Sequence, residues 1–239
     1  MRKLTARKKY IVFLIIEILI CVLWCVISLA LGRVAAGSVA SDLLLADMPM
    51  SMLGFFTQIY TPLIIFMAAC DLFTSEVHDG TIRAGFMRPV SRFKQFASRV
   101  LAIWILAAVY LVVLFVLTTA IKGVLAGSTA GLGASFISYF LDLAPLLVLV
   151  LFAAFINQFS GSPSLSVILC VILYIGFYVL GILEPRMSGL LFTGYLQWHN
   201  LWVGTALPFG AALAKVGILA GYGMVLGCAG YYLFERREV

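Results

Sequence analysis

Few residues in this chain have side chains that suit covalent chemistry. The histidines are His78 and His199, and the serines that best imitate a nucleophile lie in the sequence GSPS, Gly161–Ser164. A serine hydrolase needs a histidine within hydrogen-bond reach of its nucleophile. The membrane spans assigned below put GSPS and His199 on opposite sides of a bilayer, so we predict no catalytic residue.

Metal and redox chemistry are also poorly represented. Cys21 and Cys25 share a helix face but lack a nearby histidine or carboxylate, and His78 lies near Glu76 and Asp79 without a second strong set of ligands. We therefore predict no metal site and no disulfide framework. The cysteines all fall in or at the end of apolar runs, where they serve as small packing residues: Cys21, Cys25, Cys70, Cys170 and Cys228.

Three charged residues inside apolar runs are stronger candidates for a polar function. Glu17, Asp142 and Lys215 each carry a cost in hydrocarbon and are expected to face protein or water. Asp142 and Lys215 lie at similar depth near the same membrane face, which favours a structural ion pair. The functional alternative is that Glu17 or Asp142 lines a transport pathway and contacts a cationic substrate.

The composition indicates an integral membrane protein. Of 239 residues, 64% are hydrophobic and 11% are charged, and the mean hydropathy is +1.13, far from the roughly half-apolar, quarter-charged mix of soluble domains. Crossing a bilayer takes about 20 apolar residues. Six runs reach that length and predict a single all-α transmembrane domain over 1–239: residues 10–31, 50–70, 97–121, 135–159, 165–183 and 211–234.

The N-terminus has a rival interpretation. MRKLTARKKY is basic and precedes an apolar run, as in a secretory signal. The run over residues 10–31 is longer than the 7 to 15 residues of a signal core. We therefore predict an uncleaved first span.

Positive charge predicts the orientation. Twelve of the 16 Lys and Arg residues precede the first span, lie between the second and third spans or in the first turn of the third, or follow the last span. Short segments rich in these residues stay in the cytoplasm, so both termini and the central segment, residues 71–96, are predicted to be cytoplasmic in a bacterial-type cell membrane. Because basic residues at membrane ends are attracted to anionic headgroups, the net charge of +6 does not predict a nucleic-acid partner.

The central segment is the only long polar stretch in the sequence. Ile82, Phe86 and Pro89 follow one another at i, i+4 and i+7, while Arg83 and Arg88 point elsewhere. This spacing predicts one or two amphipathic helical turns that lie along a membrane or against a partner. The alternative is a solvated loop whose arginines only enforce topology.

The stretch EVHDGTIRAGFMRPVSRFKQF resembles the segment between the second and third spans in permease subunits of ABC exporters of the drug- and peptide-efflux type, the type-two ABC permeases. In that family an acidic residue precedes Gly-Thr, and a run like Arg-Pro-Val-Ser-Arg leads into the next helix. The ending FERREV is similar to the tail of the family. The matching residues are Glu76, Gly80, Thr81, Arg88, Pro89, Ser91 and Arg92.

The resemblance implies a coupling helix at about Thr74–Met87 that docks into a separate ATP-binding subunit. The chain has no GxxxxGK[ST] phosphate loop, so ATP and Mg²⁺ belong to that partner and this subunit is non-catalytic. The resemblance also implies a second permease, either a copy or a paralogue, that completes the pathway. The expected coupling residues are Glu76, Gly80, Thr81, Ile82, Arg83, Phe86, Arg88, Pro89 and Arg92.

Two alternatives to this function stay open. An ion-driven secondary transporter or a channel-like protein would need no ATPase, although the sequence shows no clear inverted repeat of the kind that such transporters carry. A membrane enzyme is the less favoured alternative for the reason given above. The sequence itself does not identify the substrate; a hydrophobic or amphipathic compound follows from the resemblance alone.

Other features predict local structure. Pro62 and Pro145 interrupt spans and predict kinks. The outer segment, residues 184–210, is aromatic and is either a pair of short re-entrant helices, as in some of the resembling exporters, or an interfacial belt. Two small-xxx-small pairs in the last span predict close packing with another helix, in this chain or in a second copy: Gly217 with Gly221, and Gly223 with Gly227.

Overall fold

The computed structural model describes residues 8–34, 48–75, 91–125, 131–184, 189–202 and 209–236. Every regular element within these ranges is helical. Six of the helical segments in the described ranges are long and apolar enough to cross a membrane, as expected for a multi-pass membrane protein, and they confirm the prediction of an all-α protein with six spans. These segments are Lys8–Ala30, Met48–Thr74, Arg92–Val124, Leu132–Ile156, Pro163–Leu183 and Ala212–Arg236.

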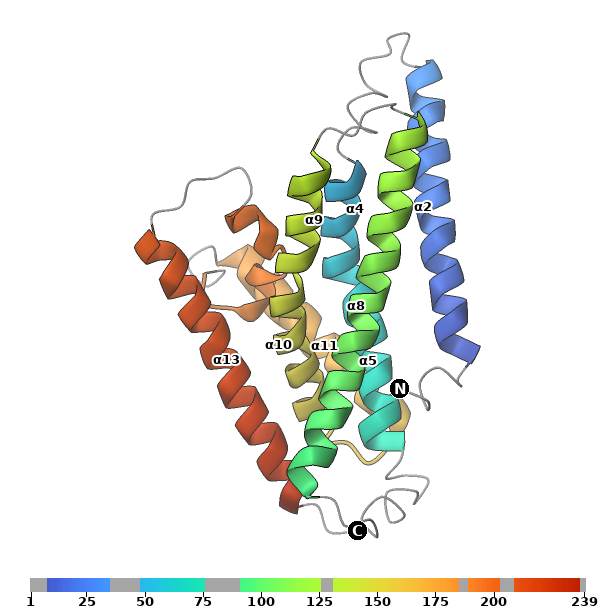
Figure 1. The fold of residues 1–239 in the computed structure, drawn as a ribbon. Helices are drawn as coiled ribbons and strands as arrows, with labels where there is room; N and C mark the ends of the chain where they lie inside the picture. The colour runs from blue at the N-terminus through green and yellow to red at the C-terminus, as the bar shows by residue number, and fades with distance from the viewer. Residues whose placement is uncertain are drawn as a thin grey trace.

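The helices form a bundle whose elements alternate in direction (Figure 1). α2 begins and α13 ends at the lower end of the bundle as drawn, and we refer to the lower and upper ends in this sense. In chain order the elements are α2 (Lys8–Val34), α4 (Met48–Phe55), η1 (Phe56–Tyr60), α5 (Thr61–Ala69), η2 (Cys70–Thr74), α8 (Arg92–Leu125), α9 (Leu132–Leu141), α10 (Leu143–Ile156), α11 (Pro163–Leu183), η3 (Phe192–Tyr195), η4 (Trp198–Leu201) and α13 (Phe209–Arg236).

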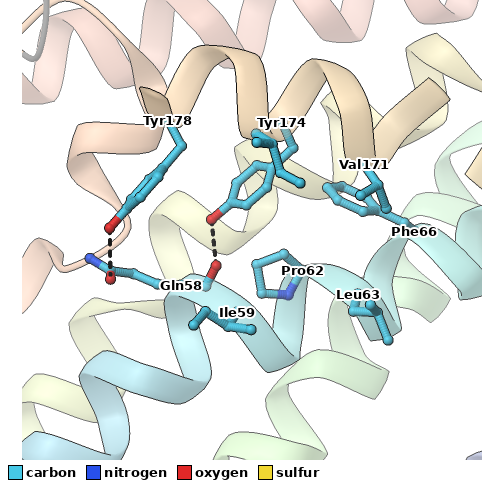
Figure 2. A pocket seen from close by; sticks show the side chains of 9 residues that line it. Gln58, Ile59, Pro62, Leu63, Phe66, Val171, Tyr174 and Tyr178 are labelled. Atoms are coloured by element: carbon cyan, nitrogen blue, oxygen red, sulfur yellow. Dashed lines mark hydrogen bonds between the residues drawn. The ribbon is translucent and has the colours of Figure 1, made fainter. Parts of the chain in front are cut away.

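The second span departs from α-helical geometry at η1 and η2, which are π-helical turns of five residues each. Pro62 follows η1 and has no N–H, so the carbonyl of Gln58, four residues earlier, lacks its usual i+4 partner. Tyr174 of α11 supplies one: its hydroxyl donates to the Gln58 carbonyl over 2.6 Å (Figure 2). The irregularity predicted at Pro62 is therefore a π-turn with an interhelical hydrogen bond.

The fourth span is divided into α9 and α10 at Asp142. Pro145 lies in the first turn of α10, and proline is tolerated there because a first-turn N–H has no helical partner. Trp104 of α8 donates its indole N–H to the carbonyl of Leu143, over 2.9 Å, beside the break. The predicted interruption at Pro145 is confirmed, and it leaves Asp142 at a turn between two helices.

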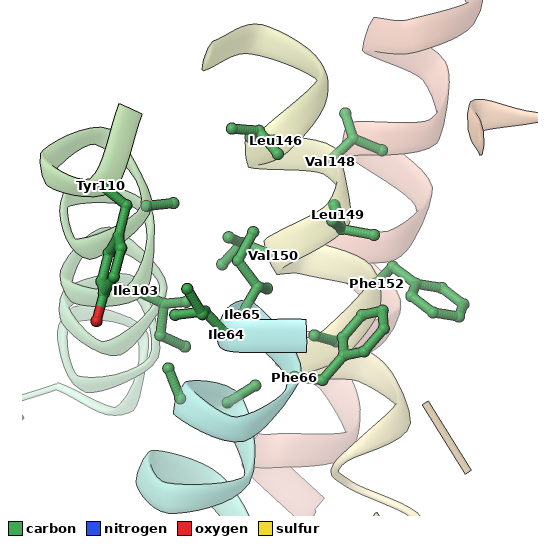
Figure 3. Close-up of a cluster of buried hydrophobic side chains, with 14 of the residues drawn as sticks. Ile64, Ile65, Phe66, Ile103, Tyr110, Leu146, Val148, Leu149, Val150 and Phe152 are labelled. Carbon is green, nitrogen blue, oxygen red and sulfur yellow. The ribbon is translucent and has the colours of Figure 1, made fainter. Parts of the chain in front are cut away.

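The second span forms the centre of the bundle. In its most apolar stretch 72% of the residues are buried, against 17% for α2 and α11 and 11% for α13. The three peripheral helices therefore present most of their apolar side chains outward, as a lipid-facing layer does. The core places α5 between α8 and α10 (Figure 3), and its largest contributors include Ile64, Ile65, Phe66, Ile103, Leu146, Leu149 and Phe152.

The glycines of α13 divide between two environments. A Cβ added at Gly223 or Gly227 would lie 3.8 Å from side chains of α10, and one at Gly230 would lie 3.3 Å from Phe96. The contacts at Gly223 and Gly227 would be ordinary van der Waals contacts, so the close approach of α13 to its own bundle is at Gly230. An added Cβ would meet nothing within 4 Å at Gly217 or Gly221, so that pair does not serve the same packing.

Candidate functional site

Most of the predicted coupling residues lie outside the described residues. Glu76, Gly80, Thr81, Ile82, Arg83, Phe86, Arg88 and Pro89 all belong to the range 76–90. Arg92 is described: it begins α8, and its guanidinium donates to the carbonyl of Glu235 near the end of α13. The structure also describes the two chain segments that flank 76–90, and these segments show how the range is attached to the bundle.

The segment that precedes the range ends in a buried polar cluster at the lower end, which we call the lower polar cluster: Thr74, Asn157 and Ser166. All three residues are fully buried. The Thr74 hydroxyl lies 2.9 Å from Asn157 Oδ1 and 3.2 Å from Ser166 Oγ, and the Ser166 hydroxyl donates to the same Asn157 oxygen. The cluster joins the end of the second span to the end of α10 and the start of α11.

The amide group of Asn157 completes this cluster. Its Nδ2 donates to the carbonyl of Ala153 over 2.7 Å, one turn earlier in α10. Its Oδ1 accepts from the two hydroxyls, so both ends of the amide are satisfied. A satisfied buried network is rigid, because breaking one bond strands a polar group in a low dielectric.

The segment that follows the range is attached through aromatic rings. Phe73 of η2, Phe96 of α8 and Phe234 of α13 form a triangle whose ring centroids lie 5.7, 6.1 and 5.8 Å apart. Arg99 lies over two of these rings, 5.6 Å from the Phe73 centroid and 5.4 Å from the Phe234 centroid, and donates to the Leu72 carbonyl over 2.6 Å. Cation–π contacts and the carbonyl thus compensate its charge.

Asp71 attaches α2 to the same end. The Lys9 ammonium and the Tyr10 hydroxyl each lie 2.5 Å from its Oδ2. The Tyr110 hydroxyl of α8 donates to the Tyr10 carbonyl over 2.6 Å. The lower ends of all six spans are therefore joined by polar or aromatic contacts.

At the upper end, Asp142 pairs with His199. The carboxylate is fully buried and accepts two bonds from one residue: the His199 backbone N–H donates to Oδ1 over 2.8 Å, and the ring Nδ1 lies 2.7 Å from Oδ2. The prediction that Asp142 pairs with Lys215 is wrong, because both acceptor oxygens face His199. Lys215 lies half-buried on α13.

Glu17 points into the bundle from the middle of α2. Its side chain is fully buried, and neither carboxyl oxygen has a hydrogen bond to a described residue. Cys21, one turn further along the helix, is fully buried as well. Burying a carboxyl group without a hydrogen-bond partner costs free energy. The packing of the described residues gives no structural reason for a carboxyl group at position 17.

Two cavities lie beside the second span and share Gln58. The polar cavity, at the upper end, has a volume of about 290 Å³, and its polar wall consists of Ser51, Gln58, Gln197, His199 and Asn200. The apolar cavity, between α5 and α11, has a volume of about 280 Å³ and is lined mainly by aliphatic and aromatic side chains (Figure 2). Sequence reasoning placed none of these residues in a site.

The serine and histidine that imitate a hydrolase are far apart. Ser162 caps α11 at the lower end, where its hydroxyl oxygen accepts from the Leu165 N–H. His199 lies in η4 at the upper end, next to α9. The described geometry therefore does not bring these two groups together.

A pair of single substitutions distinguishes the observed partner of Asp142 from the predicted one. Asp142→Asn presents an N–H₂ group to one of the two donors of His199, and should lower the free energy of unfolding by about 1.5–3 kcal/mol, the usual value of a charge-assisted hydrogen bond. Lys215→Gln should leave the free energy of unfolding within about 0.5 kcal/mol of that of the parent protein. Thermal unfolding of the purified protein in detergent measures both, and equal losses would contradict the assignment.

One protein-family model matches the part of the chain that contains most of these elements. The family model described as "Protein of unknown function (DUF2705)" matches residues 35–239, which include every described element after α2. A comparison with curated proteins finds no match. The family match contains the lower polar cluster, both cavities and the Asp142–His199 pair, and with a match over this length the chain belongs to the DUF2705 family.

Proposed function

We propose that this protein is the transmembrane permease subunit of an ATP-driven ABC exporter. The resemblance of residues 76–96 to coupling segments of that family supports the proposal. In it, the range 71–96 and both termini are cytoplasmic in a bacterial-type cell membrane, and the lower end of the bundle faces the cytoplasm. ATP and Mg²⁺ bind to a separate ATP-binding subunit, and this chain carries no catalytic residue.

The observation that carries the proposal is the attachment of the range 76–90 at both ends. Coupling requires that a force on this range reach the spans. Thr74 lies two residues before Glu76 and is bonded within the lower polar cluster to α10 and α11. On the other side, Arg99 and Phe96 connect α8 to η2 and α13. A displacement of the range would therefore act on five spans together.

This attachment favours motion of the subunit as one body. Pulling one span away from the others would break bonds that are fully buried, and each stranded group costs about 1–3 kcal/mol. Movement of the whole bundle breaks none of them. A pathway that opens and closes is then formed between two permeases, this chain and a second copy or a paralogue, and ATP binding biases their inward- and outward-facing arrangements.

Glu17 favours a second candidate function, an ion-driven transporter without an ATPase. A buried carboxyl group with no described partner is the kind of group that carries ions or protons in such transporters. The two functions differ in their energy source. Transport into proteoliposomes that requires ATP and the partner supports the exporter, whereas transport that follows an ion gradient and is lost in Glu17→Gln supports the alternative.

The first prediction of the proposed function concerns the membrane topology of the chain. In a variant without its native cysteines, a cysteine at Ser128 or Ser188 should react in whole cells with a membrane-impermeant maleimide, and a cysteine at Ser91 should react only after the cells are opened. The reason is that positive charge clusters on the cytoplasmic side. Labelling of the Ser91 position in intact cells would reverse the orientation and remove the basis for coupling.

Docking and transmission give the second prediction, and two variants separate them. Phe86→Asp puts a charge on the expected apolar docking ridge, so the chain should still insert in the membrane but no longer co-purify with its ATP-binding subunit. Thr74→Val removes one hydroxyl from the lower polar cluster. It should retain the partner, yet lose at least half of the substrate-stimulated ATP hydrolysis.

Thr119→Val is the matched control for the second variant, because among the described residues the Thr119 hydroxyl bonds only to carbonyls of its own helix. It should hydrolyse ATP like the parent. Co-purification of Phe86→Asp with normal transport would make the coupling-helix assignment wrong. Equal effects of the two threonine substitutions would show that the lower polar cluster has no special role in transmission.

A further inference from the structure

The polar cavity is lined by His199, whose ring is fixed in orientation by Asp142. Asp142 occupies both the backbone N–H and the ring Nδ1 of His199, at 2.8 and 2.7 Å. Because a carboxylate oxygen accepts, Nδ1 carries the proton and Nε2 is the ring nitrogen left for another partner. A carboxylate that fixes the tautomer and the orientation of an imidazole in this way is the usual support of a functional histidine.

The rest of the polar wall is uncharged. Among the described residues that line the polar cavity, none is Asp, Glu, Lys or Arg, and three side chains are carboxamides: Gln58, Gln197 and Asn200. Asn200 Nδ2 donates to Gln197 Oε1 over 2.9 Å, so these two amides already form one hydrogen-bonded unit. Carboxamides offer both donors and acceptors. Such a wall suits a ligand group that also has both and carries no charge, as an amide does.

Gly54 sets the space in the polar cavity. A Cβ at this position would lie 2.8 Å from Gln197 Nε2, closer than side chains pack. Any larger residue would displace the Gln197 amide. The glycine therefore lets η4 and its neighbouring residues approach α4 with the amide in place.

The apolar cavity shares Gln58 with the polar cavity and is open to the side. Its wall includes Ile59, Leu63 and Ile175, whose side chains are 60%, 41% and 51% exposed on the outer surface of the bundle. In a span, such a surface faces lipid, so the cavity is accessible to an alkyl chain from the membrane without a passage through water. The hydroxyls of Tyr174 and Tyr178 both point toward Gln58 (Figure 2), which leaves the rest of the wall apolar.

We propose that the two cavities form one binding site for an amphipathic ligand. Its uncharged amide-type headgroup lies in the polar cavity and bonds to His199 Nε2, and its alkyl chain lies in the apolar cavity. Asp142 is a positioning residue that acts through His199. The site does not depend on an ATPase, so binding is measured on this chain alone and its outcome is separate from that of the proposed function.

The test uses the fact that the sequence has two histidines. In a His78→Gln variant, ¹⁵N-labelled histidine gives the ring signals of His199 alone. The protein is placed in lipid nanodiscs, and the probe is N-dodecanoylglycinamide, which has an uncharged amide headgroup and a twelve-carbon acyl chain. Without probe, the spectrum should show a protonated Nδ1 and an unprotonated Nε2. With probe, the Nε2 signal should shift to saturation while the Nδ1 signal stays in place.

Two variants test the cavity itself. Gly54→Ala should displace the Gln197 amide and raise the apparent Kd at least tenfold, while its unchanged Nδ1 signal shows that the Asp142–His199 pair is intact. Gly133→Ala, the same change at a position where an added Cβ meets nothing within 4 Å, should bind like the parent. If Gly54→Ala does not fold, Asn200→Ala replaces it, because Asn200 is exposed and its loss removes one carboxamide, with an expected tenfold rise in the apparent Kd.

Three results would overturn the proposal. The first is an Nε2 signal that does not respond to the amide probe at any ratio of probe to lipid. The second is the same response to dodecyltrimethylammonium, a cationic amphiphile of equal chain length, which would show that the headgroup is not recognised. The third is unchanged affinity in Gly54→Ala or, in its place, Asn200→Ala, which would put the probe elsewhere.

Discussion

The structure depends on one constraint: a polar group that leaves the regular α-helix inside a bilayer must find its partner within the protein, because lipid offers none. Pro62 frees the carbonyl of Gln58, and Tyr174 takes it. Where η2 ends, Thr74 bonds to Asn157 and Ser166. At the break in the fourth span, the buried carboxylate of Asp142 is satisfied by His199. Each irregularity of the spans is thus also a contact between spans.

These contacts give the two ends of the bundle different properties. At the lower end the polar groups have partners within the bundle: both ends of the Asn157 amide are hydrogen-bonded, and the Arg99 guanidinium contacts two aromatic rings and a carbonyl. At the upper end, His199 contacts Asp142 through Nδ1, so Nε2 is turned away from the carboxylate, and the residue lines the polar cavity. We propose that the satisfied contacts at the lower end transmit force and that the polar cavity at the upper end binds a ligand. The second span contacts both ends of the bundle, and its most apolar stretch is more buried than that of any other described span.

The six spans and both interruptions were predictable because they follow from local chemistry. Run length in hydrocarbon identifies a span, and proline lacks an N–H wherever it stands. The partner of Asp142 was not predictable, because His199 lies 57 residues away in the sequence. It belongs to the outer segment, residues 184–210, which is too polar to be a span and contains the short helices η3 and η4. Lys215 was the predicted partner of Asp142 because the two residues lie at similar depth in the membrane. The lower polar cluster was missed because Thr74, Asn157 and Ser166 are neutral and give no signal in a pattern of charge and hydropathy.

The central claim is that contacts at the lower end make the described spans move as one body. Double electron–electron resonance on the proposed complex with an ATP-binding subunit tests it most directly. One pair of spin labels lies within a chain, at the lipid-exposed positions Val112 and Ile172, and a second pair is Ile172 in each of two copies. Our account predicts that a trapped ATP analogue changes the distance between the copies and leaves the distance within the chain unchanged. A change within the chain, with a constant distance between copies, would contradict it.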